Sequence, residues 1–288
     1  MLRCLSFPPN VYIELRVGDD EFTLPFVEYM QLVISMLVFS LFSHFTSVIS
    51  GGNGICTCAI DIDGRAGKEN EPSFTFSASH TTPEALDASP TTLPSPTFHL
   101  TFCGQRENGL QHCIYLLKTL AFLPGIIYAP ILIVWPHPLL MTQPAHWRDG
   151  LSEFSHLRII KILGQAVYGF VGALDGQNSD APPLFPNLGE VDIEDVDLTT
   201  TYATQAQRSN PPGMGPFEGT GSHMPVVDRL AAAVKWRAAL GCPPIVFTIR
   251  RCNVTQGQID GLMGAVEPGL SVVWDREVEG LTEKQLTN

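Results

Sequence analysis

An arginine at the end of an apolar run is the clearest candidate for a binding residue in this sequence. The run 245–249, Ile-Val-Phe-Thr-Ile, is rich in β-branched residues and typical of a buried strand, and Arg250 follows it directly. A guanidinium at a strand end can bind a carboxylate through two parallel hydrogen bonds. The plain alternative is that Arg250 is simply the first solvated residue after a buried strand.

Acidic side chains are concentrated in one short stretch upstream of that run. Five carboxylates lie within the eight residues from Glu190 to Asp197. Paired carboxylates can carry out acid–base chemistry, and clustered carboxylate oxygens can bind a hard cation. An acidic run is more commonly a solvated segment, so we expect solvation here and keep the two chemical roles as alternatives.

Cysteine and histidine spacing predicts neither a disulfide framework nor a metal site. The chain has seven cysteines at irregular positions, an odd number in a chain of 288 residues. Cys56 and Cys58 lie two positions apart, but no second Cys or His pair follows at zinc-finger spacing. The eight histidines are scattered without ligand spacing. We therefore expect free thiols, no metal and no cofactor.

The elements that would position Arg250 lie just upstream of it. Apolar residues recur at helical spacing over residues 226–240, namely Val227, Leu230, Ala231, Val234, Ala238 and, at the margin, Trp236. Gly241, Pro243 and Pro244 then separate this helix from the strand. A helix, a short turn and a buried strand make half of a βαβ unit. Further upstream, we expect a short helix over 159–163 and a strand over 166–174.

This arrangement resembles the second helix and third strand of type I 3-dehydroquinases. The shared pattern is a helix that opens at Val227-Asp228, then Arg237, then the motif Pro-Ile-Val-Phe-Thr-Ile-Arg at residues 244–250. Residues 191–198 resemble the strand that precedes this helix in the family. In fungi such a domain occurs in the pentafunctional AROM polypeptide of the shikimate pathway and, in degenerate form, in quinate repressor proteins.

The resemblance implies an α/β, partial TIM-barrel-like fold with a ligand site at the carboxyl ends of its strands. It places Arg250 at the family's substrate-binding arginine. The family follows this arginine with Thr-x-x-Gln-Gly-Gly, whereas here Gln256-Gly257 comes two residues late, so Gln256 is the weaker second candidate for substrate binding. Asp195 stands at or near a family arginine, where an acid would repel an anionic substrate.

The resemblance also implies that the catalytic residues are missing. In the family a Schiff-base lysine and a catalytic histidine lie on later strands, but here only Lys284 and no histidine follow Arg250. We therefore expect a non-catalytic, diverged protein related to quinate and shikimate metabolism, like the quinate repressor; if active, it would be a 3-dehydroquinate dehydratase. Such a pseudoenzyme would bind a shikimate- or quinate-type carboxylate and contact a transcription activator, in the cytoplasm or the nucleus.

The N-terminal half is hydrophobic, poorly patterned and divisible by composition. We expect a hydrophobic region at 1–68, a Ser/Thr/Pro-rich linker at 69–98, an apolar region of unclear fold at 99–159, and the incomplete dehydroquinase-like domain at 160–288. The low charge and weak patterning of this half are also compatible with a misassigned reading frame joined to a domain fragment.

Two runs without charged residues leave a membrane location open. The 21 residues 29–49 contain no Asp, Glu, Lys or Arg, and predict either a single membrane helix or a buried core helix. With a membrane helix, the chain would be a small single-span membrane protein, which is the alternative to the repressor-like function. The second run, 119–135, is interrupted by Pro124 and Pro130, so it is either a kinked span or a buried strand and loop.

Composition excludes one class of partner. The net charge is −12, from 17 basic and 29 acidic residues, and both halves of the chain are acidic. Because phosphate neutralisation needs clustered Lys and Arg, we expect no direct nucleic-acid binding. The hydrophobic fraction of 44% with only 16% charged residues is the opposite of a disordered chain and favours a protein with a core.

Overall fold

The chain divides into two compact units. The computed structural model describes residues 11–16, 35–36, 39, 56–63, 73–81, 98–103, 109–123, 126–135, 141–175, 182–201, 224–242, 246–265 and 271–275. The first unit comprises Met1–Ile133 and Asp149–Leu157, and the second comprises Val134–Arg148 and Arg158–Asn288. The second unit therefore takes in residues 134–148 as well as the range expected to form the α/β domain.

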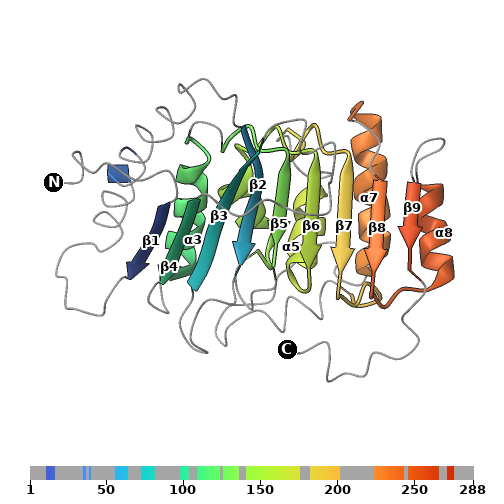
Figure 1. Ribbon diagram of the computed structural model, residues 1–288. Helices are drawn as coiled ribbons and strands as arrows, with labels where there is room; N and C mark the ends of the chain where they lie inside the picture. The colour runs from blue at the N-terminus through green and yellow to red at the C-terminus, as the bar shows by residue number, and fades with distance from the viewer. Residues whose placement is uncertain are drawn as a thin grey trace. The chain divides into compact units, whose positions relative to one another are not determined.

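The first unit contains a mixed sheet that composition did not predict (Figure 1). Its strands are β1 (Val11–Arg16), β2 (Cys56–Asp63), β3 (Ser73–Thr81) and β4 (Phe98–Cys103), in the order β1-β4-β3-β2. Strand β4 pairs parallel with β1 and antiparallel with β3, and β3 pairs antiparallel with β2. Strand β3 lies inside the range expected to be a linker. Its sequence alternates polar and apolar residues, and this two-residue period outweighs its Ser-rich composition.

The second uncharged run, residues 119–135, contains the end of a helix and a buried strand. Helix α3 (Gly109–Leu120) is followed by turns and then by β5 (Ile131–Val134), which is fully buried and directly follows Pro130. The strand-and-loop interpretation of 119–135 is correct for its described residues. Of the stretch 29–49, only Ser35, Met36 and Phe39 are described, and the rest of the predicted span lies outside the described residues. Among all described helices, none is long and apolar enough to cross a membrane.

The second unit has an α/β fold wound in one direction. Its strands β6 (Ile159–Leu163), β7 (Glu190–Glu194), β8 (Val246–Arg250) and β9 (Ser271–Trp274) are all parallel, each beside the next in sequence. Helix α4 (Pro144–Leu151) precedes β6, and helices α5 (Ala166–Leu174), α7 (Val226–Ala239) and α8 (Gln256–Gly264) follow β6, β7 and β8. Figure 1 shows α5, α7 and α8 on the same face of this sheet. Crossovers of one hand between neighbouring parallel strands produce that arrangement.

Two adjacent segments have the opposite secondary structure to the one expected. Residues 159–163 form strand β6 rather than a helix, and residues 166–174 form helix α5 rather than a strand. Three isoleucines in β6 favour an extended backbone. Every residue of α5 is buried, so the helix has no polar face and shows no amphipathic period in its sequence.

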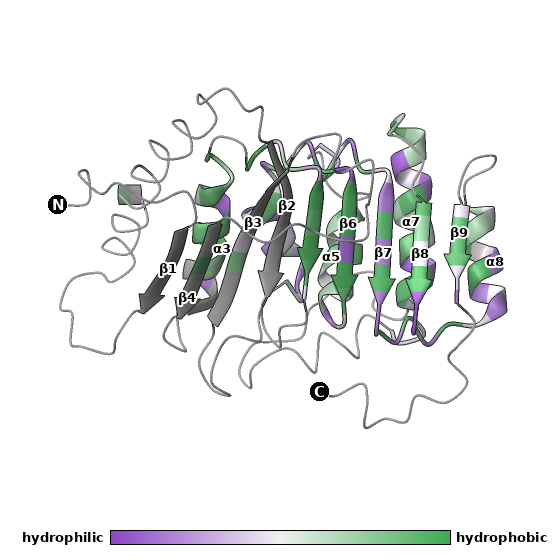
Figure 2. Ribbon diagram, viewed as in Figure 1, coloured by the Kyte–Doolittle hydropathy of each residue, from purple (hydrophilic) through white to green (hydrophobic). Residues whose placement is uncertain are grey.

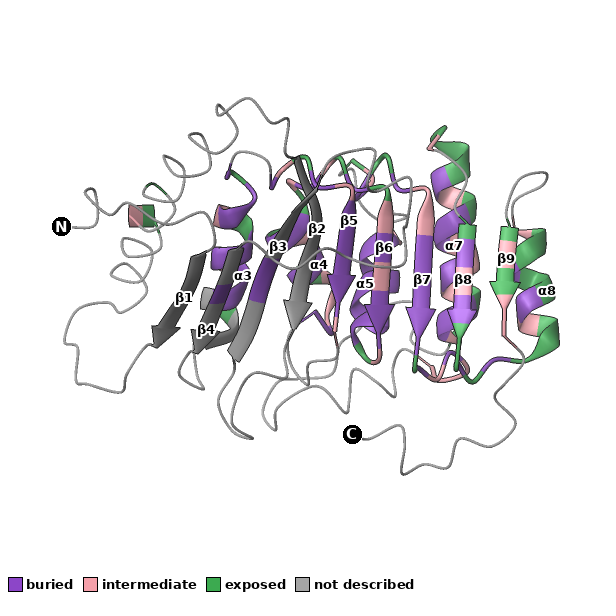
Figure 3. Ribbon diagram, in the orientation of Figure 1, coloured by how far each residue is buried: buried purple, intermediate pink, exposed green. Residues whose placement is uncertain are grey.

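The side of the sheet that faces the helices forms the core of the second unit. Parallel register aligns buried residues of β6, β7 and β8 across the sheet, namely Ile160, Ile162, Val191, Ile193, Phe247 and Ile249. In β7 the two hydrophobic residues alternate with three acidic ones, and Figure 2 colours the strand by this hydropathy. Burial decreases towards β9, as Figure 3 shows, and Val273 in that strand is 56% exposed.

Helix α7 confirms the predicted helix at 226–240, but one member of its buried face is charged. The buried residues are Val226, Val227, Leu230, Ala233, Val234 and Arg237. Ala238, expected on this face, is exposed. Arg237 is 1% exposed, and its Nη1 and Nη2 donate to the carbonyl oxygens of Leu184 and Phe185 at 2.6 and 2.9 Å. Burial lowers the pKa of this guanidinium. The arginine thus joins α7 to the loop before β7.

Candidate functional site

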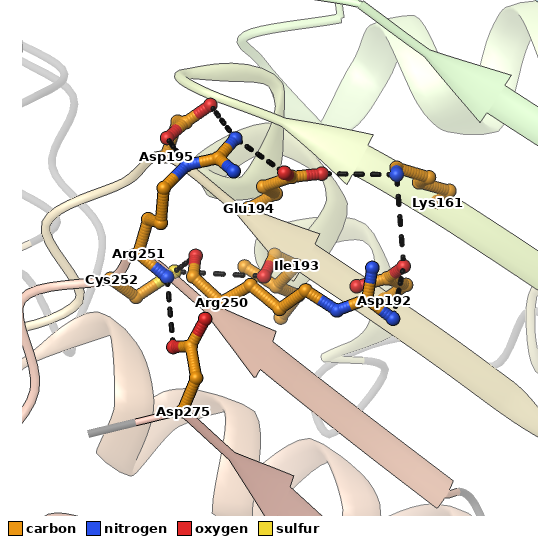
Figure 4. Close-up of polar contacts among 9 residues, drawn as sticks. All are labelled: Lys161, Asp192, Ile193, Glu194, Asp195, Arg250, Arg251, Cys252 and Asp275. Atoms are coloured by element: carbon orange, nitrogen blue, oxygen red, sulfur yellow. Dashed lines mark hydrogen bonds and ion pairs between the residues drawn. The ribbon is translucent and has the colours of Figure 1, made fainter. Parts of the chain in front are cut away.

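Strand alternation collects charged side chains on the face of the sheet opposite the helices. Parallel register aligns Lys161 in β6 with Asp192 in β7, and Glu194 in β7 with Arg250 in β8. Successive side chains of a strand point to opposite faces of a sheet. These four side chains therefore lie on the face opposite the buried isoleucines. We call them, together with Asp195, Arg251 and Asp275 at the strand ends, the charged cluster (Figure 4).

Each buried carboxylate of the charged cluster lies between two cations. Lys161 Nζ is 3.0 Å from Glu194 Oε2 and 3.9 Å from Asp192 Oδ2. Arg250 lies opposite Glu194 in register, yet its Nη2 reaches Asp192 Oδ2 at 3.6 Å. Glu194 pairs instead with Lys161 and Arg251. The side chains of Asp192 and Glu194 are 11% and 9% exposed, and such burial of a charge requires nearby partners.

Arg251 connects the carboxyl ends of β7, β8 and β9. Its Nε and Nη2 donate to the carboxylate of Asp195 at 2.7 and 2.8 Å, and its backbone N–H donates to Asp275 Oδ1 at 3.0 Å. The hydrogen bond to Asp195 is the main cause that raises the pKa of the Arg251 guanidinium. Both Asp195 (φ 58°) and Arg251 (φ 47°) have left-handed backbone, which residues other than glycine rarely adopt. Two neighbouring strands therefore end in sharp turns joined by a bidentate ion pair.

Asp192 is the least well satisfied carboxylate of the cluster. Its Oδ1 atom is buried and has no hydrogen-bond partner among the described residues. Burial raises the pKa of Asp192, while Arg250 and Lys161 lower it and Glu194 and Asp275 raise it further. Burial has the largest effect, so the ionised form of Asp192 is less stable here than in water.

Arg250 lies where the sequence predicted it, at the carboxyl end of an interior strand. Residues 246–250 are the strand β8, between β7 and β9, and Ile245 lies outside the described residues. The Arg250 side chain is 47% exposed, and the ion pair with Asp192 is its polar contact within the described part of the chain. A guanidinium carries several N–H donors in a planar fork. Arg250 therefore keeps donors that can reach a ligand from solvent.

The acidic run 190–197 is only partly the solvated segment that we expected. Asp192 and Glu194 are buried, and both lie next to cations from β6 and from the end of β8. Asp195, expected to repel an anion, is instead paired with Arg251. Glu190 and Asp197 are half-buried, and Asp195 is exposed. The expectation of solvation fails for Asp192 and Glu194 because their counter-charges come from other strands, which are distant in the sequence.

Gln256, the second predicted binding residue, begins helix α8 rather than joining the charged cluster. It is exposed, and its Nε2 donates to Asp260 Oδ1 at 2.8 Å. Thr255 and Gln258 form a capping box at this helix start. Residues 251–255, which precede Gln256, form the connection between β8 and α8 and end at the helix cap. Lys284 lies outside the described residues.

Several cluster residues were not identified from the sequence. Lys161 interrupts four apolar residues in β6, and Asp192 is flanked by Val191 and Ile193 in β7. A charged residue between apolar neighbours in a strand is the signal that could have found them, because alternation assigns it to the other face. Arg251 and Asp275 carry no comparable signal, since their roles depend on turns that only the structure reveals.

The thiol of Cys252 lies buried directly after β8, close to the charged cluster. Cys113, Cys242 and Cys252 are free thiols. Burial raises the pKa of Cys252 to about 12, and its Sγ donates to the carbonyl oxygen of Arg250 at 3.1 Å. A protonated, buried thiol is a poor nucleophile. The described residues also contain no group of three or more His, Cys, Asp or Glu side chains that could hold a metal ion.

Comparisons with known proteins give no relative for this chain. No protein-family model matches its sequence, and neither the curated proteins nor the solved structures yield a match.

Proposed function

We propose that this chain is a non-catalytic, diverged 3-dehydroquinase-like protein that binds a small carboxylate at Arg250. The observation that carries the proposal is the position of Arg250. It ends an interior parallel strand, is half exposed, and retains guanidinium donors beyond its ion pair with Asp192. Ligand sites of α/β barrels lie at the carboxyl ends of the strands, and an arginine there matches the geometry of a carboxylate.

The winding of the second unit supports a barrel-like relationship. Strands β6 to β9 are parallel and follow sequence order, and their helices lie on one face. A doubly wound sheet would instead reverse its strand order and place helices on both faces. The helix-free face would then correspond to a barrel interior, which is where the charged cluster lies.

The absence of turnover is proposed from the state of the possible nucleophiles in the cluster. A Schiff-base lysine needs a free amine to attack, whereas Lys161 Nζ is held between Glu194 and Asp192 in ion pairs. Binding without chemistry fits a sensor of a shikimate- or quinate-type carboxylate. By resemblance to quinate repressors, such a sensor would act on a transcription activator in the cytoplasm or nucleus.

Calorimetry with the full chain tests the binding site. We expect quinate or shikimate to bind, and Arg250→Ala to weaken the binding at least about tenfold, because a charge-assisted hydrogen bond is typically about 1.5–3 kcal/mol. Arg158→Ala is the matched control: Arg158 is also an exposed arginine, but it precedes β6 at the opposite end of the strands. Equal losses in the two variants would indicate non-specific charge attraction and refute the assigned site.

The same samples test for catalysis. With 3-dehydroquinate as substrate, we expect no formation of the conjugated dehydration product, measured by ultraviolet absorbance. Turnover that Arg250→Ala abolishes would contradict a non-catalytic protein and identify an active dehydratase instead.

A further inference from the structure

Asp192 is the carboxylate that pairs with Arg250 in the charged cluster. Its Oδ2 atom is 3.6 Å from Arg250 Nη2 and 3.9 Å from Lys161 Nζ, both longer than a good hydrogen bond. Its Oδ1 atom is buried and unpartnered within the described residues. The carboxylate is therefore held by charge alone, and it holds Arg250 without completing a bidentate pair.

The charges that face Asp192 come from three strands and from the residue that follows a fourth. Lys161 in β6 and Arg250 in β8 favour its ionised form, and Glu194 in β7 and Asp275 after β9 disfavour it. Two cations and two carboxylates oppose each other, so the cost of burial decides the balance and raises the pKa of Asp192. The protonated form of this side chain is thus accessible at a higher pH than for an exposed aspartate.

We propose that Asp192 is a built-in competitor for the ligand carboxylate at Arg250, so that the site binds anions weakly while Asp192 is ionised and strongly once it is neutral. This inference rests on the proposed function, because it assumes that Arg250 receives the ligand. Asp192 and the ligand carry the same charge and address the same guanidinium, so each disfavours the other. A neutral Asp192 releases Arg250 and removes the repulsion.

The sign of the pH dependence follows from this competition. As pH falls through the raised pKa of Asp192, the fraction of neutral Asp192 increases and ligand affinity rises. A simple hydroxy acid has a carboxyl pKa near or below about 4. The ligand therefore stays ionised at pH values above that, where Asp192 begins to take up its proton. Binding must also take up protons, because an anion beside Asp192 favours its protonated form.

The test compares quinate binding to the full-length protein and its variants from about pH 8 to about pH 4.5, by titration calorimetry. For the unmodified protein we expect affinity to rise roughly tenfold as pH falls, the effect of removing one nearby like charge at intermediate dielectric. Asp192→Asn should bind tightly at the highest pH and show little further change. Glu190→Gln is the matched control: it removes a carboxylate from the same strand and face, outside the charged cluster, and should keep the original pH profile.

The possible outcomes separate this inference from the proposed function. Equal affinities and equal pH profiles for the unmodified protein and Asp192→Asn would overturn the competition while leaving the Arg250 site intact. Failure of both to bind quinate at any pH would overturn the site and the competition together. If Asp192→Asn does not fold, proton uptake by the unmodified protein decides: titrations in two buffers of different ionisation enthalpy should reveal uptake on binding, and its absence would contradict the proposal.

Discussion

At the residue scale, two arginines of the second unit lie in opposite environments. Arg250 ends a strand and is half exposed, whereas Arg237 is buried on the inner face of α7. Within the described part of the chain Arg237 forms no ion pair with a carboxylate, and its donors satisfy the carbonyl oxygens of Leu184 and Phe185 instead. A buried cation loses its hydration, so these hydrogen bonds must compensate for a large part of that loss.

We predict that Arg237→Ala destabilises the protein by about 2–4 kcal/mol, since it leaves a cavity and removes donors from buried carbonyl oxygens. Arg229→Ala, on the same helix, removes an arginine that is 22% exposed and ion-paired with Asp175, and should cost about 1 kcal/mol or less. Urea unfolding of the full chain measures both. A smaller loss for Arg237→Ala than for Arg229→Ala would mean that desolvation of the buried charge outweighs its hydrogen bonds.

At the element scale, the close packing of α5 depends on a missing side chain. A Cβ atom at Gly169 would overlap the carbonyl oxygen of Met141 and lie 2.8 Å from the backbone nitrogen of Gln143. Both neighbours are backbone atoms, which cannot rotate away. The helix therefore approaches the segment before α4 at a distance that only glycine permits.

We predict that Gly169→Ala destabilises the protein by about 2–3 kcal/mol, the usual cost of overpacking a tight contact. Gly261→Ala in α8 is the matched control, because nothing lies within 4 Å of the added Cβ there. Alanine is the better helix former, so this change should stabilise by about 0.5–1 kcal/mol. Thermal melts measure both variants. A lower melting temperature for Gly169→Ala and a higher one for Gly261→Ala would support the tight packing at Gly169, whereas shifts in the same direction would contradict it.

At the scale of the whole molecule, the second unit includes a segment that precedes its first strand. Trp147 is fully buried, with its ring 5.1 Å from Phe170 and 6.4 Å from Phe185, and its Nε1 donates to the carbonyl oxygen of Met141 at 2.7 Å. Arg148 Nη2 donates to the carbonyl oxygen of Ala173 at the end of α5, also at 2.7 Å. A fragment that begins at residue 160 would lose all of these contacts.

We predict that residues 134–288 unfold in a cooperative thermal transition, whereas residues 160–288 give a broad one. Removing Trp147 exposes the apolar surface of α5, and loss of one large buried aromatic alone costs about 3–5 kcal/mol. Circular dichroism melts of the two fragments test this, with binding of a hydrophobic dye as a second readout. Equally sharp transitions would show that the segment before β6 is dispensable.

The sequence by itself determined the local elements on which the proposed site depends. Helical spacing predicted α7, and the β-branched run predicted β8 with Arg250 at its end, because both patterns arise from contacts close in sequence. The same local reasoning assigned β6 and α5 wrongly, since a helix buried on all sides has no polar face that reveals its period.

Tertiary structure decided which charges meet. Parallel register brings Lys161, Asp192 and Arg250 together from three strands that are far apart in sequence, and left-handed turns at Asp195 and Arg251 join the strand ends. Burial, rather than the number of carboxylates, then raises the pKa of Asp192. Pairing and desolvation depend on neighbours that a linear pattern does not specify, so the partners of each charge in the cluster could be recognised only in the folded chain.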